Sequence, residues 1–192
     1  MQKVAIVITA KNEERLLKHN LSYHFGIGIY KAYVYFDGAT DGGQESIKDF
    51  SNVDIQNSVD PETYEHLPFL DKFTSNATEH HTARQCLNTY DAKMKCEEES
   101  IDWLISLDAD ELFYPGFDTK DLTTFFNGLE PYDIIKLAPL EVINKKMSYT
   151  NVMAEETLFK TKKNFTSKLD QIYFDIKNPY GNKPFRTSYW FG

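Results

Sequence analysis

Short β-branched runs alternate with amphipathic segments along this chain, and no other sequence feature constrains its fold as strongly. The run KVAIVIT at residues 3–9 is almost wholly apolar, as is typical of a strand buried on both faces of a parallel sheet. The next segment has helical spacing and ends at Gly26; its predicted inner face comprises Leu16, Leu17, Leu21 and His24. This alternation predicts an α/β fold with a mostly parallel, Rossmann-like sheet and helices on both faces.

The same alternation continues to about residue 140. Further strands are predicted at residues 32–37, 53–56, 102–107 and 133–138, and further helices at residues 45–50, 80–99 and 118–128. The longest helix has a predicted apolar stripe of Ala83, Leu87, Tyr90 and Met94, beside a polar stripe of Arg84, Asn88, Asp91 and Lys95. The polar stretch at residues 58–79 is either a long functional loop or an excursion that covers a site. Beyond residue 140, ETLFKT and QIYFDI are strand-like pieces.

Length and charge narrow the class of protein. With 192 residues, the chain is predicted to form a single domain spanning residues 1–192. A net charge of -8 at pH 7 argues against a nucleic acid as the main partner. A small anion can still be bound by helix N-termini, a few basic side chains or a metal, because net charge does not describe an individual pocket.

Two features bear on the compartment. Cys86 and Cys96 fall in one predicted helix about 15 Å apart along its axis, too far for a disulfide. Reduced thiols and a cytoplasmic location are therefore expected. No segment has the pattern of a signal peptide or a transmembrane span, so we expect no transmembrane segment and leave peripheral membrane association open.

The stretch WLISLDADELFYP at residues 103–115 places several carboxylates at the end of an apolar strand. Like charges this close repel one another, and a cation is the simplest remedy. In extended geometry Asp108 and Asp110 point to one side and Ala109 to the other. Oxygen ligands suit Mg²⁺ or Mn²⁺, whose coordination is often completed by substrate phosphates. The alternative is a solvated acidic turn with no ligand.

The ends of the first two predicted strands carry TAKNE at residues 9–13 and Asp37-Gly38. Neither contains the glycine-rich G-x-G-x-x-G turn or the G-x-x-x-x-G-K-[ST] phosphate loop, which disfavours ordinary dehydrogenases and P-loop enzymes. Each candidate has a structural alternative. Glu13 can simply favour the helix N-terminus, Asp37-Gly38 can be a turn, and Arg84 can pair with an acid of its own helix or of a neighbouring element. His80 and His81 are better explained as residues that begin a helix than as metal ligands.

As an ordered set, VITAKNEERLLKHNLSYHFGIGIYKAYVYFDGATDGG, HHTARQCLN and WLISLDADELFYP resemble the nucleotide-sugar-binding half of GT-A fold glycosyltransferases, especially family-2-like and family-92-like proteins. The resemblance covers about residues 4–115 and implies a GT-A-like domain. Residues 1–115 would form the nucleotide-sugar-binding half. Residues 116–192 would form an acceptor half that is shorter than is usual, as a truncated half would be.

The resemblance also implies roles for individual residues. The first-strand loop would lie against the nucleoside, Asp37 would accept from the base, and Arg84 would contact the base or the diphosphate. Asp108 and Asp110 would hold the ribose and a Mn²⁺ or Mg²⁺ ion, with Asp110 the more direct metal ligand. The implied nucleotide-sugar-binding residues are Thr9, Ala10, Lys11, Asn12, Glu13, Asp37, Arg84, Asp108, Ala109 and Asp110.

The implied reaction is the transfer of a sugar from a nucleoside diphosphate donor, with UDP as the expected nucleotide, to a hydroxyl of a glycan or glycolipid acceptor, with inversion. Glu141 is the favoured general base; the other candidates are Glu155, Glu156 and Asp170. No histidine follows His81, so Lys183 and Arg186 are candidates for missing phosphate contacts.

Two other functions stay open at this stage. A non-catalytic nucleotide- or glycan-binding protein would keep the D-x-D motif without acceptor machinery. A sugar nucleotidyltransferase shares the architecture, but TAKNE lacks the glycines of its first loop. A role in assembling surface polysaccharide would fit the expected cytoplasmic location.

Overall fold

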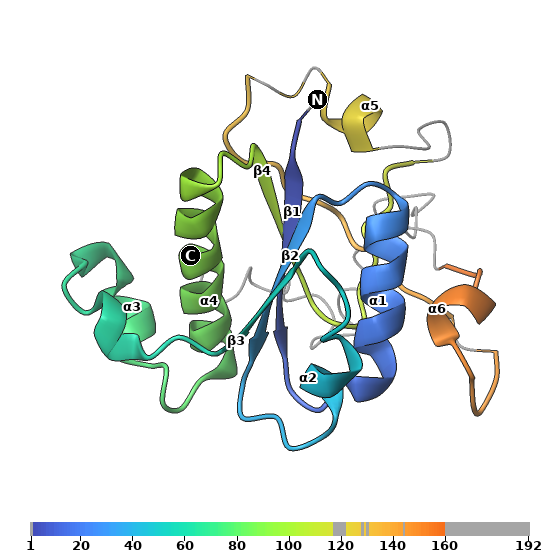
Figure 1. Ribbon diagram of the computed structural model, residues 1–192, viewed down its shortest axis with the longest axis horizontal. Coiled ribbons are helices and arrows are strands. Elements are labelled where there is room, and N and C mark those ends of the chain that lie inside the picture. Colours follow the sequence, from blue (N-terminus) through green and yellow to red (C-terminus); the bar gives the residue numbers. More distant parts are fainter. Residues whose placement is uncertain (1, 117–121, 128, 130, 144, 160–192) are drawn as a thin grey trace, which may run out of the picture. The chain divides into compact units, whose positions relative to one another are not determined.

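The structure, a computed structural model, describes residues 2–116, 122–127, 129, 131–143 and 145–159 (Figure 1). The chain divides into two compact units. Residues Met1–Leu137 and Ser148–Glu155 form the first, and Ala138–Met147 and Glu156–Gly192 form the second. The expectation of a single domain stays a prediction. The α/β sheet lies wholly in the first unit.

Four strands form a parallel sheet, as predicted. They are β1 (Val4–Ala10), β2 (Lys31–Phe36), β3 (Val53–Asn57) and β4 (Trp103–Leu107). Their order is β3-β2-β1-β4, and every pair is parallel. The chain steps outward in one direction from β1 to β3 and then returns to the other side of β1. The strand order therefore reverses between β1 and β4, and crevices at such a point bind ligands in open α/β sheets.

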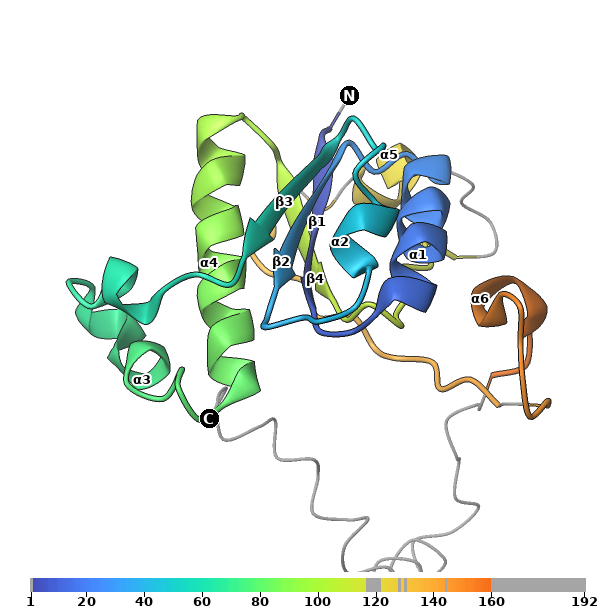
Figure 2. The ribbon, with the colours of Figure 1, turned by 60° about the horizontal axis from the view of Figure 1, so that its bottom comes forward.

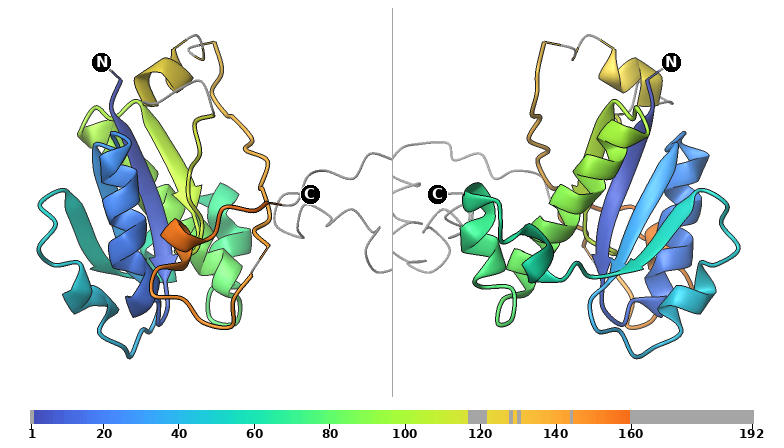
Figure 3. Two further views of the ribbon diagram at one scale, coloured as in Figure 1. Left: turned by 90° about the vertical axis from the view of Figure 1, so that its right-hand side faces the viewer. Right: turned by 60° about the vertical axis from the view of Figure 1, so that its left-hand side comes forward.

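Helices cover both faces of the sheet, which confirms the second part of the fold prediction. Helices α1 (Glu14–Gly26) and α2 (Gly43–Ser46) lie on one face, and α4 (His81–Glu98) lies on the other (Figure 2). Figure 3 shows the same arrangement from two further sides. The seven residues of β1 are all buried. Period-two alternation sends Ile6 and Ile8 toward the α1 face and Ala5 and Val7 toward α4.

The stretch at residues 58–79 is an excursion packed against α4. It contains two 3₁₀ turns, η1 (Pro61–Tyr64) and η2 (Pro68–Leu70), and the short helix α3 (Asp71–Thr74). Leu70 and Ala77 are buried against Leu87 of α4. The hydroxyl of Tyr64 donates to Asp91 Oδ1 at 2.6 Å. The excursion is therefore folded onto the helix by its own small core.

The polar stripe of α4, and not the predicted apolar stripe alone, faces the sheet. The buried residues of the helix are Ala83, Leu87, Asn88, Ala92 and Cys96. Asp91 accepts a hydrogen bond from the β2 residue Tyr35 (2.6 Å between Oδ2 and the hydroxyl oxygen). It also forms an ion pair with Lys95 of the same helix (3.0 Å). This face of the sheet carries tyrosine hydroxyls, and the polar surface of α4 provides their hydrogen-bond partners.

Other predicted elements differ from the structure. Residues 133–138 form no strand, and Ile134 is 87% exposed; a short apolar run has no intrinsic strand preference without a neighbour to pair with. The helix predicted at residues 45–50 lies at Gly43–Ser46, and α5 (Leu122–Phe126) is the part of the predicted 118–128 helix that is described. A last helix, α6, spans Val152–Glu155.

In the second unit, Phe159 of ETLFKT makes an isolated antiparallel bridge with Val142, and QIYFDI lies outside the described residues. Cys86 and Cys96 are both free thiols. Within the described part of the chain, no helix has the length and apolar character needed to cross a membrane.

Candidate functional site

The carboxyl ends of β1, β2 and β4 meet at one edge of the sheet. Asp37 follows β2 directly, and its backbone N–H donates to the carbonyl oxygen of Ala10 at 2.9 Å. Asp108 follows β4, which pairs with β1 on its other side. Parallel pairing thus brings the TAKNE loop, Asp37 and the D-x-D motif to the reversal of strand order.

Residues 108–111 form a turn, here called the acidic turn, and not the extended segment that was expected. The N–H of Glu111 donates to the carbonyl oxygen of Asp108 (3.0 Å), and Glu111 Oε2 accepts from the N–H of Asp108 (3.0 Å). Ala109 is buried in the core while Asp108 and Asp110 are exposed. The predicted separation of the two carboxylates from Ala109 therefore holds, although a turn produces it.

Three side chains of α1 hold the backbone of the acidic turn and the residues after it. Asn20 Nδ2 donates to the carbonyl oxygens of Ala109 (3.0 Å) and Glu111 (2.8 Å). The Tyr23 hydroxyl donates to the Phe113 carbonyl oxygen (2.9 Å), and the Phe113 N–H donates to His24 Nε2 (3.1 Å). Sequence reasoning placed His24 on the inner face of this helix but gave none of the three a role in the site.

Glu13 adds a carboxylate from the first loop. Its carbonyl oxygen accepts from Leu16 and Leu17 at the start of α1, but its side chain makes no capping hydrogen bond. Partial burial raises its pKa, and the negative charges of Asp110, Asp41 and Asp108 raise it further while Arg15 opposes them. The carboxylates of the first loop and the acidic turn therefore lie close enough to repel one another.

The TAKNE loop is tied to the loop after β2. Asn12 adopts a left-handed backbone (φ 60°), and its Oδ1 accepts from the Thr40 N–H at 2.8 Å. Asp41 Oδ2 accepts from the N–H of Glu14 (2.8 Å), whose own Oε2 accepts from the Gly42 N–H (3.1 Å). Asparagine tolerates this backbone better than most residues. Lys11 and Asn12 are exposed, and Thr9 and Ala10 are buried.

Asp37 is enclosed by two basic side chains of α4 and is only 7% exposed. Arg84 makes a two-pronged contact, with Nε 2.7 Å from Oδ1 and Nη2 2.8 Å from Oδ2, and His81 Nδ1 lies 3.0 Å from Oδ2. Burial raises the pKa of Asp37, but the hydrogen bonds from Arg84 and His81 outweigh it and hold the pKa below its usual value. Arg84 therefore pairs with an acid of a neighbouring element, which was one of the alternatives.

Helix α4 also reaches the other strand ends. Gln85 Nε2 donates to Asp108 Oδ1 (2.8 Å), and Asn88 Nδ2 donates to Thr9 Oγ1 (3.0 Å). Arg84 Nη1 donates to the carbonyl oxygen of Ala77 in the excursion (2.6 Å). His80 is the N-cap and His81 the first residue of α4, as predicted. One polar helix surface thus touches β1, β2 and β4 at the carboxyl edge.

The metal prediction rests on Asp108 and Asp110. No group of three or more His, Cys, Asp or Glu side chains in the described ranges is arranged to hold a metal ion. Two carboxylates nevertheless fit a hard cation whose other ligands are water and phosphate oxygens, as is usual for Mg²⁺ sites. The donor atoms are compatible with Mn²⁺ or Mg²⁺ bound together with a diphosphate.

None of the candidate general bases belongs to the TAKNE loop, to the end of β2 or to the acidic turn. Glu141 is exposed and belongs to the second unit. Glu155 Oε1 accepts from the N–H groups of Thr150 and Asn151 at the start of α6 (2.9 and 2.8 Å), which is a structural role. Glu156 is buried, and its Oε1 accepts from the Lys145 N–H (2.8 Å). Asp170, Lys183 and Arg186 lie outside the described residues.

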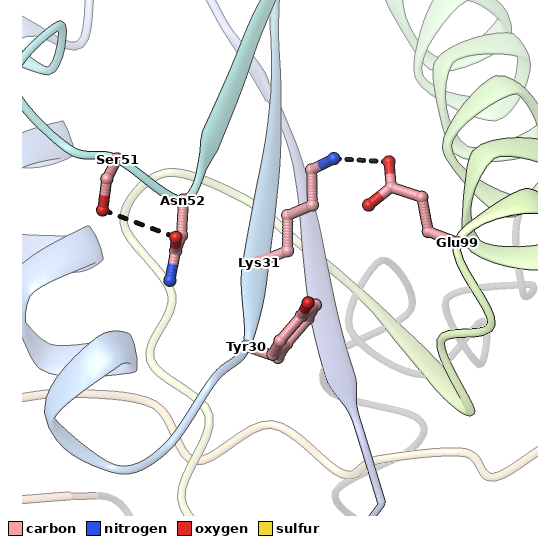
Figure 4. Close-up of a pocket in the computed structure, with 5 residues that line it drawn as sticks. All are labelled: Tyr30, Lys31, Ser51, Asn52 and Glu99. Atoms are coloured by element: carbon pink, nitrogen blue, oxygen red, sulfur yellow. Dashed lines mark hydrogen bonds and ion pairs between the residues drawn. The ribbon is translucent and has the colours of Figure 1, made fainter.

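Two cavities open at the opposite, amino edge of the sheet. Figure 4 shows the first, of about 190 Å³, lined by Tyr30, Lys31, Ser51, Asn52 and Glu99. Lys31 and Glu99 form an ion pair there. The second, of about 500 Å³, is lined by Ser22, Phe25, Ile29, Phe50, Ser51 and Asn52. Neither cavity includes a predicted site residue. In the first cavity, Glu99 neutralises the positive charge of Lys31 that would otherwise attract an anion.

No model of a known protein family matches the chain, and no curated protein matches it.

Proposed function

We propose that this protein is a metal-dependent GT-A type glycosyltransferase that uses a nucleoside diphosphate sugar, with UDP as the nucleotide. The observation that carries the proposal is the group of carboxylates of Glu13, Asp108 and Asp110 at the reversal of strand order. Within the described residues, no Lys, Arg or His forms an ion pair with Asp108 or Asp110. A bound cation would offset this negative charge.

The two sides of the carboxyl edge suit the two parts of such a donor. Asp108 and Asp110 would hold Mn²⁺ or Mg²⁺, which supplies charge neutralisation for the departing diphosphate when bound. Thr9 to Glu13 and Asp37 would contact the nucleoside. The three side-chain nitrogens of Arg84 already contact Asp37 and Ala77. Arg84 would therefore orient Asp37, and its two remaining N–H groups would contact the base or the diphosphate.

Glu141 stays the proposed general base for an acceptor hydroxyl. In an inverting transfer this carboxylate removes the hydroxyl proton on the face opposite the leaving group. The acceptor would be a glycan or glycolipid. A cytoplasmic location, with or without peripheral membrane contact, belongs to the same proposal.

A non-catalytic nucleotide- or glycan-binding protein is the second candidate. The structural roles of Glu155 and Glu156 favour it, because two of the four candidate bases are used to hold backbone N–H groups. Transfer or hydrolysis of a UDP-sugar separates the two functions, since a binding protein gives no turnover.

Thermal unfolding with UDP tests the donor site before any acceptor is known. We expect UDP with Mn²⁺ to raise the midpoint of the wild-type protein and UDP alone to raise it much less. Asp110→Asn should abolish the metal-dependent part. Asp49→Asn is the matched control, since Asp49 is an exposed aspartate in the turn before β3, at the amino edge. Equal midpoints with and without Mn²⁺ would refute the proposal.

A further inference from the structure

We propose that Asn20 and His24 are positioning residues that fix the acidic turn in the conformation that receives metal and diphosphate. This inference rests on the proposed function. It gives α1 a part in the donor site from behind the turn, without contact to the ligand.

Asn20 bonds the backbone of the acidic turn on both sides of Asp110. Its Nδ2 donates to the carbonyl oxygens of Ala109 and Glu111, at 3.0 and 2.8 Å. These are the residues immediately before and after Asp110. With a carbonyl oxygen on each side of Asp110 held by one amide, the backbone around Asp110 has little freedom to move relative to α1.

His24 continues the same connection to Phe113, two residues after the acidic turn. Its Nε2 accepts from the Phe113 N–H at 3.1 Å, so this nitrogen carries no proton. Its Nδ1 therefore carries the proton and donates to Asn20 Oδ1, 2.8 Å away. That bond orients the Asn20 amide, which leaves Nδ2 for the two carbonyl oxygens. The hydrogen bond of each group thus fixes the orientation of the next.

Burial makes these contacts hard to replace. Asn20 and His24 are both 0% exposed. Solvent therefore offers no substitute partner for the carbonyl and N–H groups of the turn if either side chain is lost, and unsatisfied buried polar groups are costly. An apolar pair would fill the same space. The side-chain polar atoms of Asn20 and His24 instead contact one another, the Asn20 carbonyl oxygen and the backbone of residues 109–113.

The supported backbone carries exposed carboxylates. Asp108 and Asp110 project from the turn whose inner residue, Ala109, is packed in the core. A metal held by two carboxylates needs them at a fixed separation, and partners behind the ligands typically change metal affinity about 10- to 100-fold. Asn20 and His24 are placed to supply that support.

The test measures the binding of UDP with Mn²⁺, the binding of uridine without metal, and hydrogen exchange of the free protein. We expect Asn20→Asp to weaken Mn²⁺-dependent UDP binding by about 10- to 100-fold, because a carboxylate has no N–H for the two carbonyl oxygens. Binding of uridine without metal should be unchanged. Hydrogen exchange of residues 108–113 in the free protein should become faster. Tyr23→Phe, which removes only the bond to the Phe113 carbonyl, is a milder variant that should change the same quantities less.

Ser22→Ala is the matched control, because the Ser22 hydroxyl donates to the Lys18 carbonyl oxygen of the same helix and is exposed. It should behave as wild type. Wild-type exchange and wild-type Mn²⁺-dependent UDP affinity in both other variants would overturn the inference, as would an equal loss of uridine binding, which marks general damage to the fold. Absence of Mn²⁺-dependent UDP binding in the wild-type protein would overturn the proposed function and this inference together.

Discussion

The strands β2 and β4 are each followed by an aspartate at the same edge of the sheet, but the two aspartates have opposite surroundings. Asp37 is almost completely buried, and its two carboxylate oxygens face Arg84 and His81. Asp108 is exposed, as is Asp110 two residues later, and neither has a cationic partner among the described residues. Charge is balanced within the protein at the end of β2 and is left unbalanced at the end of β4.

The difference shows where an ionic ligand is needed. A buried carboxylate must be paired, because desolvation of a lone charge is costly. Exposed carboxylates can be solvated by water, yet partial burial of Glu13 and, after it, the charges of Asp110, Asp41 and Asp108 raise the pKa of Glu13. At the end of β2 the side chain is fixed by charge. At the end of β4 the backbone is fixed by Asn20, Tyr23 and His24, and Asp108 accepts one hydrogen bond from the neutral amide of Gln85. The negative charge there is left for a cation to balance.

Acid should affect the support of the β4 end most. Burial, opposed only by a hydrogen bond to Asn20, lowers the pKa of His24 from 6.5 to about 4. The unfolded chain therefore takes up this proton first. The contribution of neutral His24 to the free energy of unfolding is fully present above pH 6.5. It is lost as the pH falls toward 4, by up to about 3 kcal/mol. Urea unfolding at pH 7 and 4.5 measures it, and His24→Gln should show a smaller pH-dependent loss. Parallel losses in the two proteins would contradict this.

Removing the charge at the β2 end should have the next largest effect. Asp37→Asn leaves the Arg84 guanidinium beside a neutral amide in a mostly buried position, and we expect a loss of about 2 kcal/mol in the free energy of unfolding, less than for a fully buried pair because Arg84 is partly exposed. The urea midpoint measures this at neutral pH. Asp49→Asn is the control, and a loss no larger than in that variant would show that the ion pair stabilises little.

The corresponding change at the β4 end should have the smallest effect on stability. Asp110→Asn removes an exposed charge and part of the repulsion at Glu13, so the free energy of unfolding should stay within about 0.5 kcal/mol of wild type. The sign of any change should be stabilising. A destabilisation as large as that of Asp37→Asn would mean that Asp110 has an intramolecular partner, and the contrast between the strand ends would fail.

The strands, their parallel arrangement and the convergence of their ends were accessible from the sequence. The run at residues 3–9 is apolar because β1 is covered on both faces, and the aspartates at the ends of β2 and β4 could be placed by strand pattern alone. Residues 133–138 show the limit of that pattern. Their apolar character suits a strand, but in the described structure they have no strand partner.

The buried polar residues that support the site were harder to predict from the sequence. Asn20 and Asn88 are completely buried, yet hydrophobic periodicity gives no reason to bury an asparagine. Asn20 donates to backbone carbonyl oxygens 89 and 91 residues away. Asn88 donates to the hydroxyls of Thr9 and Ser58 and accepts from the Val59 N–H. His24 lay at the correct helical spacing, and four-residue separation from Asn20 was a usable signal. The hydrogen bond to Phe113 depends on tertiary structure alone.

A crystal structure with Mn²⁺ and UDP tests the central claim most directly. We expect an anomalous peak that places a manganese ion beside a carboxylate oxygen of Asp110, with or without Asp108, and in contact with the diphosphate. Residues 109–113 should keep their hydrogen bonds to α1. A bound nucleotide with no metal at these aspartates, or a metal and diphosphate bound elsewhere, would contradict it.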